Sequence, residues 1–311
     1  MRIVFFGSPA AALPSLTGLI EAGHKIELVI TQPDRPAGRG KEPTPPPVKQ
    51  FGLERGIPVL QPEKIRGDEG VLEKLKKINP DIQVVVAYGQ IIPAAIIYLP
   101  RLKSVNVHFS LLPKYRGAAP VQWAILNGER MTGVTIFELN EKMDEGDVIS
   151  QVEAVIGPRE NAPELEARLA QIGAELLIQT LEEVESLPRR PQDHARATLA
   201  PRLHKEQGRI NWTADADSID RMVRALAPWP GAFAFFRCQR LILHAGRPLR
   251  GAAAACRKPG QVSGAAAEGL SVCCGGGSVY LIERLQRENK KPLSAAAFLR
   301  GAKIKAGEIL E

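Results

Sequence analysis

Residues Ser104 to Gly117 read SVNVHFSLLPKYRG, and the rest of the chain is organised around this stretch. Apolar and polar residues alternate as far as the phenylalanine, which predicts a strand, and Pro113 ends it because proline cannot donate to the ladder. Asn106 and His108 are two residues apart, so both side chains lie on one face of the strand. An amide can donate to a developing oxyanion and an imidazole can move a proton, which together suit acyl transfer. Taken alone, the pair is better explained as two polar residues that cap a strand end, because a two-residue coincidence is common.

The N-terminal part of the chain alternates between strand and helix patterns. Arg2 to Phe6 and Ile26 to Thr31 are short apolar runs, and Leu13 to Ala22 between them has leucines at helical spacing. Ile82 to Ala87, read IQVVVA, is apolar and rich in β-branched residues, which predicts a central strand buried on both faces. This rhythm predicts an α/β domain built on a Rossmann-like parallel sheet with helices on its faces.

The last third of the chain differs in pattern and in charge. Short β-like runs separated by glycine and polar turns predict a small β-barrel. Residues 208–311 contain 16 basic and 8 acidic residues, whereas the whole chain carries a net charge of +7. All of the net positive charge therefore lies here, which indicates a polyanionic partner such as a nucleic acid. We expect a first domain over residues 1–189, a linker over 190–207 and the barrel domain over 208–311.

The stretch from Gln32 to Lys49, QPDRPAGRGKEPTPPPVK, is rich in proline and glycine. This composition predicts a loop without a helix or a central strand. The loop is long for a connection inside a domain, and long loops tend to be functional. It presents Arg35, Arg39 and Lys41, which suit phosphate contacts that form on binding. A solvated linker is the alternative.

Metal sites and membrane segments are not indicated. Asn140 to Asp147 is dense in carboxylates, but no histidine accompanies them, so we interpret the run as an acidic turn. The four cysteines show no C-x-x-C spacing, which argues against zinc. No apolar run approaches the roughly 20 residues of a membrane helix, and the N-terminus lacks a signal-peptide pattern. We expect a cytoplasmic protein that contacts no membrane.

Two long motifs carry a family resemblance. SVNVHFSLLPKYRGAAPVQWAILNGE and TGVTIFELNEKMDEGD resemble the core of the folate-dependent formyltransferases. Within that superfamily the whole chain, from RIVFFGSP to SAAAFLRGAKIKAGEIL, resembles the methionyl-tRNA formyltransferases. The resemblance implies that Asn106, His108 and Asp144 are the catalytic residues. It also implies that the C-terminal domain is an oligonucleotide-binding-like barrel and that the Arg35–Lys41 loop grips tRNA.

The implied reaction transfers a formyl group from 10-formyltetrahydrofolate to the methionine α-amino group of initiator methionyl-tRNA, for translation initiation. The implied enzyme needs no metal, and we expect a monomer. The expected folate-binding residues are Tyr88, Gly89, Gln90, Ile91, Ile92, Ser110, Leu111, Leu112 and Pro113. The expected tRNA-binding residues are Arg35, Arg39, Lys41, Arg237, Arg240, Lys290, Lys291, Lys303 and Lys305.

Four positions depart from the family pattern: Ala10 and Ala11 replace an acidic residue and a phenylalanine, Glu42 replaces a basic residue, and Trp123 replaces an arginine. Three other functions stay open. A formyltransferase for a nucleotide-linked sugar amine or a formyltetrahydrofolate hydrolase would reuse the same three catalytic residues, but the basic loop and the basic last third speak against both. A non-catalytic RNA-binding protein is the third, and the presence of all three catalytic residues speaks against it.

Overall fold

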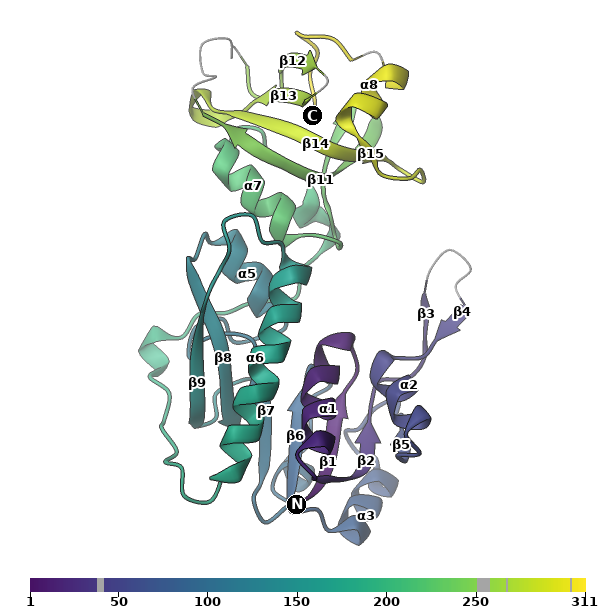
Figure 1. The fold of residues 1–311 in the computed structure, drawn as a ribbon, viewed down its shortest axis with the longest axis vertical. Coiled ribbons are helices and arrows are strands. Elements are labelled where there is room, and N and C mark those ends of the chain that lie inside the picture. Colours follow the sequence, from purple (N-terminus) through teal and green to yellow (C-terminus); the bar gives the residue numbers. More distant parts are fainter. Residues whose placement is uncertain (38–41, 251–257, 267, 303) are drawn as a thin grey trace. The chain divides into compact units, whose positions relative to one another are not determined.

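The computed structural model describes residues 1–37, 42–250, 258–266, 268–302 and 304–311 (Figure 1). The chain forms two units. The first consists of Met1–Pro120, Met131–Val155 and Glu166–Pro201, and the second of Val121–Arg130, Ile156–Leu165 and Arg202–Glu311. The domain boundaries expected from the sequence remain a prediction. No helix in the described part of the chain is both long enough and apolar enough to cross a membrane.

The first unit is built on a seven-stranded sheet with the order β5-β2-β1-β6-β7-β8-β9. Its first five strands pair in parallel, and β8 and β9 add antiparallel pairs at one edge. The predicted Rossmann-like α/β fold is confirmed, with an antiparallel edge. The strands are β1 (Arg2–Gly7), β2 (Lys25–Ile30), β5 (Val59–Leu60), β6 (Ile82–Val86), β7 (Ser104–His108), β8 (Met131–Glu138) and β9 (Val148–Val155).

The centre of this sheet is buried as the sequence predicts. All five residues of β6 are buried, and the strand pairs with β1 on one side and β7 on the other.

The helices of the N-terminal two thirds are α1 (Leu13–Glu21), α2 (Pro47–Glu54), α3 (Glu69–Ile78), α4 (Ala94–Ile97), α5 (Pro120–Leu126) and α6 (Ala162–Glu182).

Helix α6 packs closely on one face of the sheet because it has a glycine at the contact. A Cβ atom on Gly173 would lie 2.9 Å from a methyl carbon of Val107 on β7 and 3.3 Å from one of Val134 on β8. Any larger residue would push the helix away from the strands. The face of β7 that carries Val107 is therefore covered, and the face of Asn106 and His108 is the opposite one.

The proline-rich stretch differs from the prediction. Strands β3 (Arg35–Ala37) and β4 (Glu42–Thr44) form a two-stranded hairpin, which is not part of the main sheet. The prediction that no helix lies in residues 32–49 is wrong at its end, because α2 begins at Pro47. Proline is favoured at a first helical position, where its missing N–H would have no partner and its φ is already helical.

The second unit is an antiparallel sheet with the order β10-β11-β14-β13-β12, to which β15 adds beside β14. Its helices in the last third of the chain are α7 (Ala216–Ala225) and α8 (Ala295–Ala302). Its strands are β10 (Ala232–Phe236), β11 (Gln239–Leu249), β12 (Val262–Ala266), β13 (Gly269–Cys273), β14 (Val279–Arg287) and β15 (Leu293–Ser294).

The last residues of the chain join the two edges of this sheet. The backbone of Val262 in β12 exchanges two hydrogen bonds of 2.8 Å with Gly307 and Glu308. The backbone of Phe235 in β10 exchanges bonds of 2.7 and 2.8 Å with Glu311. The C-terminal segment therefore closes the sheet into a barrel, as the sequence predicts, and leaves neither edge strand unpaired at these positions.

This closure predicts a strong dependence of stability on Leu310, which is 1% exposed and belongs to the core of the second unit. Leu310→Ala should lower the free energy of unfolding of this unit by about 2–5 kcal/mol, because it leaves a cavity at the seam. Glu311→Ala is the matched control and should change it by less than about 0.5 kcal/mol, since Glu311 pairs through its backbone. Urea denaturation of both variants measures the difference, and equal stabilities would show that the seam contributes nothing.

Candidate active site

Asn106 and His108 lie near the carboxyl end of β7, on the face that α6 does not cover. His108 is 6% exposed, and its ring meets Phe137 edge-on at a centroid distance of 6.3 Å. Asn106 is only partly buried, and its side chain makes no hydrogen bond within the described part of the chain. Its amide is therefore available to a ligand.

Asp144 reaches His108 by an indirect route. Strand β8 runs antiparallel to β7, so its last residues lie beside the start of β7. Leu139, the residue after β8, donates its N–H to Ser104 O at 2.8 Å. The loop of residues 139–147 then doubles back, because the Asp144 carboxylate lies 3.7 Å from His108 Nδ1 at the other end of β7. Two residues far apart in sequence are thus brought together.

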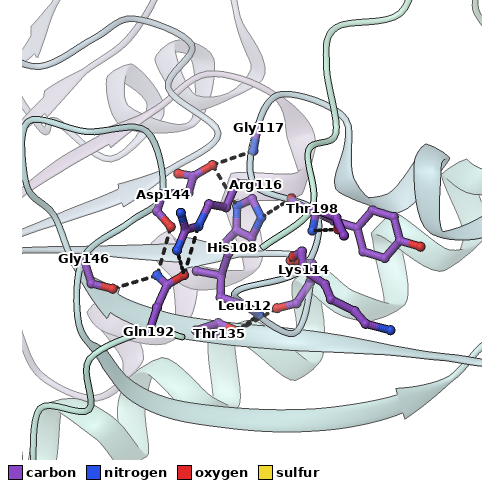
Figure 2. Close-up of polar contacts among 12 residues, drawn as sticks. His108, Leu112, Lys114, Arg116, Gly117, Thr135, Asp144, Gly146, Gln192 and Thr198 are labelled. Atoms are coloured by element: carbon purple, nitrogen blue, oxygen red, sulfur yellow. Dashed lines mark hydrogen bonds and ion pairs between the residues drawn. The ribbon is translucent and has the colours of Figure 1, made fainter. Parts of the chain in front are cut away.

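The two ring nitrogens of His108 both face oxygen atoms. Nε2 lies 2.9 Å from the carbonyl oxygen of Tyr115, and Nδ1 faces the Asp144 carboxylate (Figure 2). A neutral imidazole donates through one nitrogen only, whereas the protonated ring donates through both. Each ring nitrogen therefore has an oxygen atom that can accept its N–H when the ring carries a second proton.

The backbone of Asp144 is held in a left-handed conformation, with φ of 54°. Its Oδ2 accepts a hydrogen bond of 2.8 Å from Gly117 N, and its carbonyl accepts one of 2.9 Å from Gln192 Nε2 (Figure 2). The same nitrogen donates to the carbonyl of Gly146 at 2.7 Å. A Cβ on Gly146 would fall 1.6 Å from the carbonyl oxygen of Glu138, so only glycine fits there.

Arg116 is a charged residue inside this site, with 4% of its surface exposed. Its guanidinium donates to Gln192 Oε1 at 3.1 and 2.8 Å and pairs with Glu145 at 3.3 Å. It also lies 3.2 Å from His194 Nδ1. A buried charge needs such partners, and here they tie the Asp144 loop to residues 189–200, which we call the strap.

The loop after β7 is anchored from β8 and β9. The hydroxyl of Thr135 donates to Ser110 O at 2.6 Å and accepts from Leu112 N at 3.1 Å. Gln151 Nε2 donates to both Thr135 Oγ1, at 2.9 Å, and Leu112 O, at 2.8 Å. Side chains of the antiparallel edge therefore fix the backbone of residues 110–112.

Comparison with known proteins identifies the family. Residues 1–181 match the formyl transferase family, and residues 202–303 match the formyl transferase C-terminal domain. This chain belongs to the formyl transferase family. It is 47% identical to a methionyl-tRNA formyltransferase of Solibacter usitatus, over 100% of this chain and 98% of the relative. It is 44% identical to one of Citrifermentans bemidjiense, over 100% and 96%.

Several solved structures share the fold. HypX from Aquifex aeolicus, in complex with tetrahydrofolic acid, matches with a TM-score of 0.66 at 21% identity, over 96% of this chain and 47% of HypX. An N-formyltransferase from Helicobacter canadensis, in complex with folinic acid and dTDP-3-aminofucose, matches with a TM-score of 0.67 at 17% identity, over 92% and 99%. At these identities the likeness concerns the fold alone.

The first predicted folate stretch, after β6, uses most of its side chains internally. Tyr88 is buried against Phe6, and burial raises the pKa of its phenol. Gln90 accepts from Ile65 N at 2.9 Å and donates to Pro62 O at 3.1 Å. Ile92 is buried, whereas Gly89 and Ile91 are exposed, Ile91 by 74%.

The second predicted folate stretch follows β7. Ser110 and Leu112 are buried, whereas Leu111 and Pro113 are partly exposed. Because β6 and β7 are parallel neighbours, both stretches lie at the carboxyl edge of the sheet, where α/β folds bind ligands. This edge offers a small molecule mainly backbone groups and a few apolar side chains.

Some of the predicted tRNA contacts are exposed, and others already have a partner within the protein. Arg35, Lys290, Lys291 and Lys305 are exposed. Arg237 is paired with Glu308, and Arg240 lies over the ring of Phe233 at 3.8 Å. The predicted contacts Arg39, Lys41 and Lys303 lie outside the described residues.

Several residues that shape the site were not predicted from the sequence, namely Arg116, Thr135, Gln151, Gln192 and Thr198, whose hydroxyl accepts a hydrogen bond of 2.9 Å from Tyr115 N. Arg116 had a usable signal, since it lies within the motif SVNVHFSLLPKYRG that also contains Asn106 and His108. The others bond mainly to backbone atoms, which leaves no pattern in composition or spacing. Among the residues that the structure describes, no group of three or more metal-ligating side chains occurs.

The anchoring of residues 110–112 predicts a difference between two threonines of one strand. Thr135→Val should lower the free energy of unfolding by about 1–3 kcal/mol, because it leaves buried backbone groups without partners. Thr132→Val is the control: Thr132 is also buried on β8, but its hydroxyl has no partner within the described residues, so its loss should be nearly neutral. Denaturant melts of both variants provide the comparison, and equal losses would contradict the anchoring role.

Proposed function

We propose that this chain transfers a formyl group from 10-formyltetrahydrofolate to the α-amino group of methionine on initiator methionyl-tRNA. The observation that supports it most is that His108 and Asp144 meet at 3.7 Å beside Asn106, at the ligand-binding edge of a formyl transferase sheet. Relatives that share 44–47% of the sequence over its whole length are methionyl-tRNA formyltransferases.

In the proposed mechanism the methionine amine attacks the formyl carbon and forms a C–N bond, which gives a tetrahedral intermediate. Asn106 donates to the oxyanion, a contribution that typically lowers a barrier by about 3–4 kcal/mol. His108 takes the proton that the amine loses and delivers it to the folate nitrogen as the bond between that nitrogen and the formyl carbon breaks. Asp144 orients the imidazole and balances its charge while it holds the extra proton.

The folate donor is proposed to bind along residues 88–92 and 110–113. HypX was solved with tetrahydrofolic acid, and a sugar 3N-formyl transferase, WlaRD, with 5-N-formyl-THF, both on a related fold. Backbone groups after β6 and β7 are suited to the hydrogen-bonding edge of a pterin ring. The donor stays a co-substrate, and no metal enters the proposed reaction.

The catalytic proposal predicts that Asn106→Ala, His108→Ala and Asp144→Ala each lower turnover by about two orders of magnitude or more while the chain still folds. Asp144→Asn removes the negative charge but keeps the size of the side chain, and asparagine tolerates the left-handed backbone of this position. Turnover of this variant should also be low. The assay is formylation of charged initiator tRNA, with circular dichroism as the folding control. A folded variant with a near-wild-type rate would remove that residue from the mechanism.

The same assay separates the rival functions. Charged initiator tRNA, a nucleotide-linked sugar amine and water are offered as acceptors of the formyl group in parallel reactions. Formylation of the sugar amine alone, or release of formate alone, would replace the proposed function with that of a sugar formyltransferase or a hydrolase. Binding of tRNA without any turnover would leave a non-catalytic RNA-binding protein.

We also propose that nine basic residues bind the tRNA backbone: Arg35, Arg39 and Lys41 in the first unit, and Arg237, Arg240, Lys290, Lys291, Lys303 and Lys305 in the second. Lys290 and Lys291 are the simplest phosphate contacts, because both are exposed and neither pairs with a carboxylate in the described part of the chain. We further propose a cytoplasmic monomer with a catalytic domain over residues 1–189, a connection over 190–207 and a tRNA-binding domain over 208–311.

The RNA proposal predicts a change in salt dependence. Replacement of Lys290 and Lys291 by glutamine should weaken tRNA binding and lower the slope of log K against log salt by about 0.7–0.9 for each phosphate that the variant no longer neutralises. Lys77→Gln on α3 is the control, because Lys77 is equally exposed but lies outside the proposed surface. Titration of tRNA at several salt concentrations gives the slopes, and an unchanged slope in the double variant would rule out these contacts.

A further inference from the structure

The strap lies between the two family matches, which end at residue 181 and resume at residue 202. It is nevertheless bonded to both loops of the candidate active site. Arg190 and Val148 exchange two backbone hydrogen bonds of 2.9 Å at the start of β9. Thr198 O accepts from Arg116 N at 2.9 Å, and Ala200 N donates to Arg116 O at 2.7 Å.

The start of the strap is fixed by a buried carboxylate. Glu138 accepts hydrogen bonds of 2.7 Å from both Lys103 and Arg189. Burial opposes ionisation of this group, yet the two hydrogen bonds hold the pKa of Glu138 below its usual value. The strap is therefore anchored where the Asp144 loop begins.

Gln192 is the residue of the strap that contacts the Asp144 loop, and it is 7% exposed. Its amide nitrogen donates to the carbonyls of Asp144 and Gly146, and its amide oxygen accepts twice from Arg116 (Figure 2). Both protons of the amide and its oxygen are thus used. A glutamate cannot donate to the two carbonyls, and a leucine can neither donate nor accept.

The Asp144 loop needs such support for a physical reason. It has no ladder partner between Leu139 and Asp147, and Asp144 has a left-handed backbone conformation, which is uncommon for residues other than glycine even though aspartate tolerates it better than most. Release of the Asp144 carbonyl would let the peptide rotate. The carboxylate would then move away from His108 Nδ1.

We propose that Gln192 is a positioning residue that, with Arg116 behind it, holds Asp144 against His108 for catalysis. The inference rests on the proposed formyl transfer. The hydrogen bonds of Gln192 go to the Asp144 loop and to Arg116, so we expect its loss to act on catalysis through Asp144. A misplacement of about 1 Å in a catalytic group can cost a factor of about 100 in rate.

The test uses full-length Gln192→Leu and Gln192→Glu in the formylation assay. Both should lower kcat by about 10- to 100-fold and change KM for tRNA and for the folate donor less than about twofold. Gln192→Glu keeps an acceptor for Arg116, so it reports on the carbonyl contacts even where Gln192→Leu folds poorly. Gln83→Leu is the control, since Gln83 is a fully buried amide of the same unit that bonds to Ser104 instead.

A double-mutant cycle separates positioning from general structural support. If Gln192 acts through Asp144, then Gln192→Leu combined with Asp144→Asn should be no slower than Asp144→Asn alone, and the two single variants should shift the pH–rate profile in the same direction. Multiplicative losses in the double variant, or wild-type kcat in a folded Gln192 variant, would overturn the inference. Absence of formyl transfer by the wild-type chain would instead refute the proposed function.

Discussion

The chain leaves β8 beside the start of β7, whereas His108 lies at the end of β7. The candidate site depends on the path by which the following loop brings Asp144 back to His108. The antiparallel pairing of β8 releases the chain beside Ser104, and His108 lies four residues along the strand, a distance of about 13 Å. The loop therefore runs back over the sheet. A glycine without room for a side chain, a left-handed aspartate, a buried arginine and a glutamine from the strap are all consequences of that path.

The sequence was informative where a side-chain pattern reports the structure directly. Alternation placed Asn106 and His108 on one face of β7, and a β-branched run identified β6 as central. The strap was not recognisable, because its polar and proline-containing sequence is that of a linker and its bonds go largely to backbone atoms. Pro47 was taken as a sign of irregular structure, although at a first helical position it is favourable. Closure of the barrel depends on backbone pairing of the last residues, which composition does not reveal.

Some of the expected ligand residues already have partners inside the protein and others do not, and their spacing in the sequence could not show which. Tyr88 and Gln90 serve the interior of the first unit, so their value to a ligand lies in the backbone that they hold in place. Arg237 and Arg240 likewise have partners of their own, a carboxylate and an aromatic ring. Lys290 and Lys291 are free of such contacts within the described residues. A residue type indicates what a side chain is able to do, whereas its neighbours decide whether it is available.

The pairing of Glu311 with β10 has a consequence for biosynthesis. A ribosome makes the chain from the N-terminus, and domains usually fold in that order. Every strand of the first sheet and the strap that holds Asp144 precede residue 201, so the first unit has all of its parts while the second is still being made. The barrel gains its closing segment only when Glu311 has been added. The two units therefore acquire all of their parts at different times during synthesis.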